Sequence, residues 1–146
     1  MLQFTKGDIT KTQFFVVPVN TVGAMGKGLA LDVAKKFPLV EQSYKSALRA
    51  NILDIGKVCP VYIPGHNIYL LPTKKDWHNP STLEYVESGL RGLVKTILKE
   101  GLDLGTVAIP KLGCGLGGLD WQDVKPLIEE AARDFAAHGV DTLVYV

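Results

Sequence analysis

Residues 14–30 read FFVVPVNTVGAMGKGLA, an apolar run that leads through a glycine-rich turn into a helical pattern. The run at residues 14–20 is apolar on both faces, which is typical of a strand that helices cover on both sides. Residues 106–121, TVAIPKLGCGLGGLDW, repeat the order of strand, glycine-rich turn and helix start. Together the two stretches predict an α/β fold.

Composition limits the class of protein. The 146 residues have the length of a single domain, residues 1–146, and a content of 47% hydrophobic and 21% charged residues excludes a disordered segment. No apolar run approaches the roughly 18 residues of a membrane-spanning helix, and no secretion signal precedes the first strand, so no membrane association is expected. The two cysteines lack metal-ligand spacing, which favours a cytoplasmic location. With a net charge of only +1, any contact with nucleic acid must be local.

Short β-rich runs alternate with helical patterns along the chain. Strands are expected at residues 2–5, 14–20, 58–63, 68–71, 106–110 and 142–146. Helices are expected after Gly28, after Leu39, from Ser81 to Gly101, and from Asp120 to just before Gly139. Ser81 and Glu84 are expected to form a capping box. Two closely spaced strands around Gly65 suggest a hairpin, so the prediction is a three-layer α/β/α sandwich with a central, mixed, six-stranded sheet.

The two glycine-rich turns, GAMGKG at residues 23–28 and GCGLGG at residues 113–118, are candidate phosphate-binding loops. A glycine-rich loop between a strand and a helix can hold a phosphate with backbone N–H groups and the helix dipole. Two such loops suit a diphosphate. The alternative is that each is only a tight turn, because glycine turns are common.

Familiar motifs fit these loops poorly. GAMGKG lacks the spacing and the Ser or Thr of a Walker A loop. GCGLGG satisfies G-x-G-x-x-G, but it lies too near the end of the chain for an acidic residue on a following strand to meet a ribose, as a Rossmann site requires. No G-x-S-x-G elbow is present, and the histidines show no metal-ligand spacing, so no metal or other cofactor is expected.

A few side chains near these loops are candidates for chemistry. Lys74 follows a predicted strand beside Lys75, and a lysine held in its neutral form attacks carbonyl-like carbons, although exposed lysine pairs are usually only solvated. Asn20 ends the first apolar strand and either faces a ligand or shapes the turn. Asp8 either accepts a hydrogen bond from an exocyclic amine or caps backbone N–H groups. Cys114 lacks an identifiable base, so it is expected to be a small loop residue rather than a nucleophile.

Three motifs, in this order, carry a resemblance that covers essentially the whole chain: VNTVGAMGKGLA, LPTKKDW and IPKLGCGLGGLDW. They resemble the macrodomain family, whose fold binds ADP-ribose. Within it they are most similar to the DarG antitoxin type, which removes ADP-ribose from thymidine in DNA, and to the related human terminal ADP-ribose glycohydrolase. The resemblance implies an N-glycosyl hydrolase.

The resemblance also implies roles for particular residues. Lys74 matches the family's essential lysine, which attacks C1 of the distal ribose and leaves an imine that water resolves. Asp8 and the backbone of Ile9 hold adenine, Asn20 lies near the distal ribose, and the two loops wrap the diphosphate and this ribose. The remaining substrate-binding residues implied are Val22, Gly23, Met25, Gly26, Lys27, Gly28, Leu29, Thr73, Lys111, Gly113, Cys114, Gly115, Leu116 and Gly117. Lys27, Lys74, Lys75 and Lys111 are expected to form a positive rim around the cleft.

One position departs from the human relative, which carries an Asp where this chain has Gly117. Asp120 is then the nearest carboxylate. The DNA-directed antitoxins also lack that Asp, so the departure favours a DNA substrate over protein glutamyl esters.

The expected ligands are therefore ADP-ribose and ADP-ribosylated single-stranded DNA, with a DarT-type toxin as a further partner and a monomer as the oligomeric state. Two alternatives stay open. One is a hydrolase of ADP-ribose 1″-phosphate, O-acetyl-ADP-ribose or protein-linked ADP-ribose. The other is a non-catalytic reader of ADP-ribose.

Overall fold

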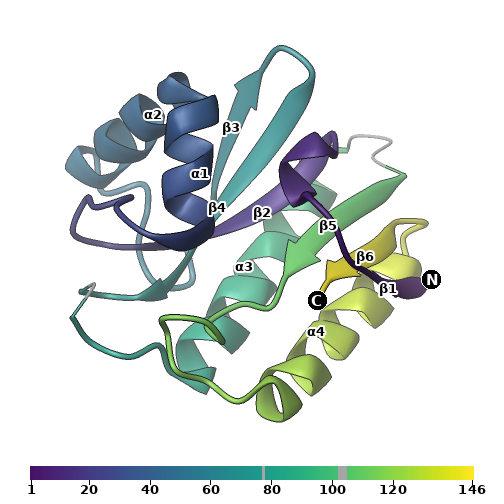
Figure 1. The fold of residues 1–146 in the computed structure, drawn as a ribbon. Helices are drawn as coiled ribbons and strands as arrows, with labels where there is room; N and C mark the ends of the chain where they lie inside the picture. The colour runs from purple at the N-terminus through teal and green to yellow at the C-terminus, as the bar shows by residue number, and fades with distance from the viewer. Residues whose placement is uncertain (77, 102–104) are drawn as a thin grey trace.

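A six-stranded sheet runs through the centre of the molecule (Figure 1). The computed structural model describes residues 1–76, 78–101 and 105–146. The strands are β1 (Leu2–Thr5), β2 (Phe14–Asn20), β3 (Cys59–Ile63), β4 (His66–Lys74), β5 (Thr106–Pro110) and β6 (Asp141–Tyr145). Their order in the sheet is β1-β6-β5-β2-β4-β3, so the strands that precede the two glycine-rich loops, β2 and β5, are neighbours.

Helices cover both faces of this sheet. They are α1 (Gly28–Lys36), α2 (Pro38–Arg49), α3 (Leu83–Glu100) and α4 (Trp121–Ala136). Helices α1 and α2 pack on one face, where Val33 and Tyr44 meet Phe15 of β2. Helices α3 and α4 pack on the other face, where Leu93 and Ile128 meet Val16 (Figure 1). Phe15 and Val16 are both fully buried, because successive side chains of a central strand point into opposite layers. The predicted three-layer sandwich is confirmed.

The sheet is mixed, as predicted. Five strands, in the order β1, β6, β5, β2 and β4, run parallel to one another. The edge strand β3 is antiparallel to β4. Ile63 of β3 pairs with His66 of β4, so the hairpin turns through the two residues between them, Pro64 and Gly65. Gly65 has a φ of +83°, a conformation that glycine adopts without steric cost.

Most predicted boundaries hold within one or two residues, but two predictions were wrong. β4 was expected at residues 68–71 and extends from His66 to Lys74, because pairing with β2 continues through polar residues. The capping box at Ser81 does not form. Helix α3 is capped instead by Thr82, whose hydroxyl accepts a hydrogen bond from the Tyr85 N–H at 3.1 Å.

The parallel strands β2, β4 and β5 end at the same edge of the sheet, and both glycine-rich loops leave from this edge. Ligands of open α/β sheets bind at the carboxyl ends of such strands. None of the helices in the described ranges is long and apolar enough to cross a membrane.

Candidate functional site

A cavity of about 550 Å³ opens at this edge of the sheet. It lies between the loop that follows β2 and the loop that follows β5, with the end of β4 between them. This volume is in the range that encloses a nucleotide-sized ligand. The sequence-predicted residues that line it are Asn20, Gly26, Lys27, Gly28, Leu29, Thr73, Lys74, Lys111, Gly113, Gly115, Leu116 and Gly117. The structure therefore brings both loops and the candidate lysine to one place.

Other predicted residues lie outside the cavity lining. These are Asp8, Ile9, Val22, Gly23, Met25 and Cys114. Met25 is 3% exposed and packs in the core beneath α1 and α2, so it supports the first loop from below. Val22 points outward and is exposed.

The charge of the cavity comes from lysines. Lys27, Lys74 and Lys111 line it, and no Asp or Glu is among the described lining residues. Lys75 was expected on the same positive rim, and this expectation was wrong. Its ammonium lies 5.9 Å from the centroid of the Tyr85 ring on α3, outside the cavity. A cavity lined by three lysines, with no carboxylate among the lining residues that the structure describes, suits an anionic ligand such as a diphosphate.

Lys74 is the last residue of β4 and is partly buried. Among the described residues its ammonium has no hydrogen-bond or ion-pair partner, in contrast to Lys36, which pairs with Asp8 at 2.7 Å. An amine that lines a cavity with no ion-pair partner among the described residues is available to a ligand.

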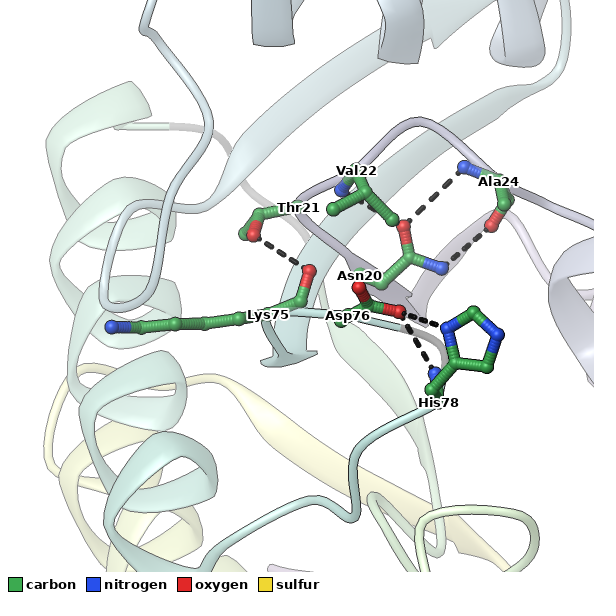
Figure 2. A network of polar contacts seen from close by, with 7 residues as sticks. All are labelled: Asn20, Thr21, Val22, Ala24, Lys75, Asp76 and His78. Atoms are coloured by element: carbon green, nitrogen blue, oxygen red, sulfur yellow. Dashed lines mark hydrogen bonds and ion pairs between the residues drawn. The ribbon is translucent and has the colours of Figure 1, made fainter.

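The amide of Asn20 is occupied by the first glycine-rich loop (Figure 2). Its Oδ1 accepts hydrogen bonds from the Val22 N–H at 3.1 Å and the Ala24 N–H at 3.3 Å, and its Nδ2 donates to the Ala24 carbonyl at 2.9 Å. The Tyr44 hydroxyl, buried under the loop, lies 2.7 Å from the same Oδ1 and accepts from the Gly23 N–H at 3.2 Å. Asn20 therefore shapes the loop and also lines the cavity.

Burial raises the pKa of Tyr44 to about 12, so its hydroxyl stays protonated and keeps its donor. Sequence reasoning missed this residue. The sequence does contain an indication of its role. Tyr44 lies on the apolar face of an expected helix, and a buried tyrosine hydroxyl needs a hydrogen-bond partner.

The second loop is packed so closely that only glycine fits at two positions. Gly113 has a φ of +74°, and a Cβ there would approach the side chain of Leu119 to 2.7 Å. A Cβ on Gly117 would come within 3 Å of both the Gly113 carbonyl and the Ser81 hydroxyl. The Ser81 N–H donates to the Gly117 carbonyl at 3.0 Å and ties the loop to the start of α3. At these two positions the loop therefore presents only its backbone to the cavity.

Ser81 is the second residue that sequence reasoning missed, because it was assigned to the helix cap. It lines the cavity and is 3% exposed. Within the described ranges, its hydroxyl has no hydrogen-bond partner.

Asp8 caps the 3₁₀ helix Ile9–Lys11. Its Oδ1 accepts from the Thr10 N–H at 3.0 Å and the Thr10 hydroxyl at 2.6 Å, and its Oδ2 accepts from the Lys36 ammonium at 2.7 Å. These bonds, first that from Lys36, hold the pKa of Asp8 well below its usual range. The carboxylate is thus ionised and still part-exposed, as an acceptor of a ligand amine must be.

Neither Cys114 nor Asp120 is arranged for catalysis. Burial raises the pKa of the Cys114 thiol, which lies 3.6 Å from the Leu112 carbonyl oxygen. Asp120 caps α4, with its Oδ1 accepting from the Gln122 N–H at 2.9 Å. No cluster of three His, Cys, Asp or Glu side chains that could hold a metal ion occurs in the part of the chain that is described.

The sequence is similar to those of two named glycohydrolases. A protein named DNA ADP-ribosyl glycohydrolase from Thermus aquaticus is 41% identical over 152 residues, which cover 99% of this chain and 41% of that protein. This chain thus spans about two fifths of the length of that relative. The human ADP-ribose glycohydrolase OARD1 is 29% identical over 147 residues, covering 99% of this chain and 90% of that protein.

Solved structures agree with the fold. The macrodomain of Thermus aquaticus DarG superposes with a TM-score of 0.90 at 39% identity, covering all of this chain and 98% of that one. Thermosipho africanus DarTG in complex with ADP-ribose superposes with a TM-score of 0.86 at 35% identity, covering 99% of this chain and 41% of that one. The Macro domain family model matches residues 16–128, which include both glycine-rich loops and Lys74. The chain therefore belongs to the macrodomain family, with its nearest likeness among these relatives to the DarG type.

Proposed function

We propose that this chain is a glycohydrolase that removes ADP-ribose from thymidine in single-stranded DNA. The observation that carries the proposal is the position of Lys74, which lies in the cavity between the two glycine-rich loops with no ion-pair partner among the described residues. The name of the Thermus aquaticus relative supports the reaction, and the ADP-ribose complex of the Thermosipho africanus protein supports the ligand.

In this proposal the diphosphate binds the backbones of Gly26–Leu29 and Gly113–Gly117, with Lys27 and Lys111 supplying positive charge. Asp8 accepts a hydrogen bond from the adenine amine next to the Ile9 backbone. Asn20 and Thr73 bound the end of the cavity that holds the distal ribose, and Val22, Gly23, Met25 and Cys114 hold the loops in shape.

Lys74 acts as the nucleophile. Its neutral amine attacks C1″ of the distal ribose, the bond to the thymine nitrogen breaks, and the electron pair leaves with that nitrogen, which takes up one amine proton. The second amine proton passes to the ring oxygen as the ribose opens to a neutral imine. Water adds to C1″, the lysine amine leaves, and the aldehyde closes again to ADP-ribose. The balance is one water consumed for each ADP-ribose released.

The absence of a carboxylate from the described lining supports a nucleobase as the leaving group. In the step above, the proton that the departing nitrogen needs comes from the attacking amine. The close approach of Ser81 and the Gly113 carbonyl leaves no room for a side chain at Gly117, the position at which the resemblance implies an Asp in the human relative.

We expect such an enzyme to act in the cytoplasm, where DNA is modified, as a monomer, and to oppose a DarT-type toxin that attaches ADP-ribose to DNA. ADP-ribosylated single-stranded DNA is then its substrate partner. The net charge of +1 means that the three cavity lysines, rather than a general field, guide the modified nucleotide.

The test is incubation with a single-stranded oligonucleotide carrying ADP-ribose on one thymidine, with released ADP-ribose as the readout. We expect release by the wild type and none by Lys74→Ala. Lys125→Ala is the control, because it removes a lysine whose ammonium lies over the Phe4 ring, 5.1 Å from its centroid and outside the cavity lining. Release of phosphate or acetate from ADP-ribose 1″-phosphate or O-acetyl-ADP-ribose, with no action on DNA, would instead select the esterase alternative.

A further inference from the structure

The carbonyl of Lys75 accepts two hydrogen bonds from Thr21, the residue that follows β2, and Figure 2 shows the one from the hydroxyl. The Thr21 N–H donates to it at 3.1 Å, and the Thr21 hydroxyl donates to it at 2.9 Å. Backbone pairing between neighbouring parallel strands supplies only one N–H for each carbonyl, so the hydroxyl is an additional tie. This tie holds the carbonyl of the residue that directly follows Lys74.

This tie lies where the β2–β4 ladder becomes irregular. Val19 pairs with Pro72, but the next residue, Asn20, pairs with Lys74, so Thr73 is an extra residue on β4. A bulge of this kind changes the direction of the side chains that follow it. The ladder alone therefore does not determine where Lys74 points.

The two lysines point to different places. Lys74 lines the cavity, whereas the Lys75 side chain extends away from the Asn20 group and reaches the Tyr85 ring (Figure 2). Neighbouring side chains of an extended chain point to opposite sides, so a tie that holds the Lys75 carbonyl in place also restricts the direction of the preceding side chain, Lys74.

Thr21 is itself held on both sides. Asn20 before it is bonded to the buried Tyr44 hydroxyl, and Val22 after it donates its N–H to Asn20 Oδ1. The tie therefore runs from a buried tyrosine of α2 through Asn20 and Thr21 to the carbonyl of Lys75, the residue that follows Lys74.

We infer that Thr21 is a positioning residue that holds Lys74 at the reacting carbon through the Lys75 carbonyl. The inference rests on the proposed function of Lys74 as nucleophile. It does not make Thr21 a ligand contact, because Thr21 is absent from the cavity lining.

The experiment compares Thr21→Val and Thr21→Ser in release of ADP-ribose from the modified oligonucleotide. Valine has the shape of threonine but no donor, whereas serine keeps the hydroxyl. We expect kcat to fall about tenfold in Thr21→Val, with KM and the Kd for ADP-ribose within about twofold of wild type, because displacement of a nucleophile affects the chemical step rather than binding. Thr21→Ser should recover most of kcat.

Thr5→Val is the control for loss of a threonine hydroxyl, because the Thr5 hydroxyl donates to the Lys6 carbonyl at 3.4 Å on the edge strand β1, away from the cavity. It should leave kcat unchanged. Wild-type kcat in Thr21→Val, or equal losses in Thr21→Val and Thr21→Ser, overturns the inference while the proposed function stands. A wild type that binds ADP-ribose but releases none from the modified DNA overturns the proposed function, and the inference with it.

Discussion

The hydroxyl of Tyr44 lies 2.7 Å from both the backbone carbonyl oxygen and Oδ1 of Asn20. It joins a fully buried position on α2 to the base of the first glycine-rich loop. The loop that faces the cavity is thus anchored from the layer of α1 and α2, and the second loop is anchored by Ser81 from the layer of α3 and α4. The end of β4 lies between these two anchors and carries Lys74.

Tyr44→Phe tests the first anchor. The substitution leaves the Gly23 N–H and Asn20 Oδ1 without the hydroxyl, so we expect the free energy of unfolding to fall by about 1–3 kcal/mol. ADP-ribose affinity should fall as well, by about threefold to tenfold, because the loop is less ordered before binding. Chemical denaturation and calorimetry measure the two effects. A variant as stable as wild type would show that the hydroxyl does not support the loop.

Gly117→Ala tests the packing of the second loop. The new Cβ meets the Gly113 carbonyl and Ser81, so we expect a loss of stability of about 1–3 kcal/mol and at least a tenfold loss of ADP-ribose affinity. Gly92→Ala is the matched control. Its Cβ would meet the Gly56 carbonyl, but Gly92 lies on α3 outside the cavity lining, so it should lower stability without lowering affinity. Equal affinities in the two variants would contradict the account of Gly117.

Ser81→Ala tests whether the buried hydroxyl lacks a protein partner, as it does among the described residues. Removing an unsatisfied buried hydroxyl should leave the free energy of unfolding unchanged or raise it by up to about 1 kcal/mol. Thr142→Val is the control, because Thr142 carries the other such hydroxyl and lies on β6, outside the cavity lining. Each variant's free energy of unfolding is compared with that of the wild type. A much larger loss in Ser81→Ala than in Thr142→Val would show that the Ser81 hydroxyl has a structural partner.

Asp8 gives the protein an acid-sensitive contact. Its pKa is lower in the folded chain than in the unfolded chain, mainly because of the bond from Lys36, so its contribution to stability is present above the unfolded value near pH 4 and is lost as the pH falls further. We expect Asp8→Asn to lower the Tm at pH 7, with the difference from wild type shrinking below about pH 4. Thermal melts from pH 3 to pH 7 measure it, and a difference independent of pH would contradict the role of the ion pair.

Much of the fold could be predicted from the sequence because the decisive patterns are local. The doubly buried run at residues 14–20, the two glycine-rich turns and the Asp120 cap depend only on neighbouring residues. The position of the site followed, since β2 and β5 precede the two loops and lie side by side.

The details of the candidate site and the cap of α3 could not be predicted, because they depend on contacts between residues that are distant in the sequence. Local pattern does not reveal that Asn20 bonds to Tyr44, or that Lys74, which follows the extra residue Thr73, lines the cavity while Lys75 lies near the Tyr85 ring. Likewise, Ser81 and Thr82 both satisfy the chemistry of a helix cap, and the tie from the Ser81 N–H to Gly117 decides between them.

Trapping of the covalent intermediate tests whether Lys74 is the nucleophile. The wild type is mixed with the ADP-ribosylated oligonucleotide in the presence of borohydride, which reduces an imine to a stable amine, and the modified peptide is then located by mass spectrometry. We expect an ADP-ribose adduct on Lys74, loss of the adduct in Lys74→Ala, and no release of ADP-ribose by that variant. An adduct on another residue, or release by Lys74→Ala at the wild-type rate, would contradict this role of Lys74.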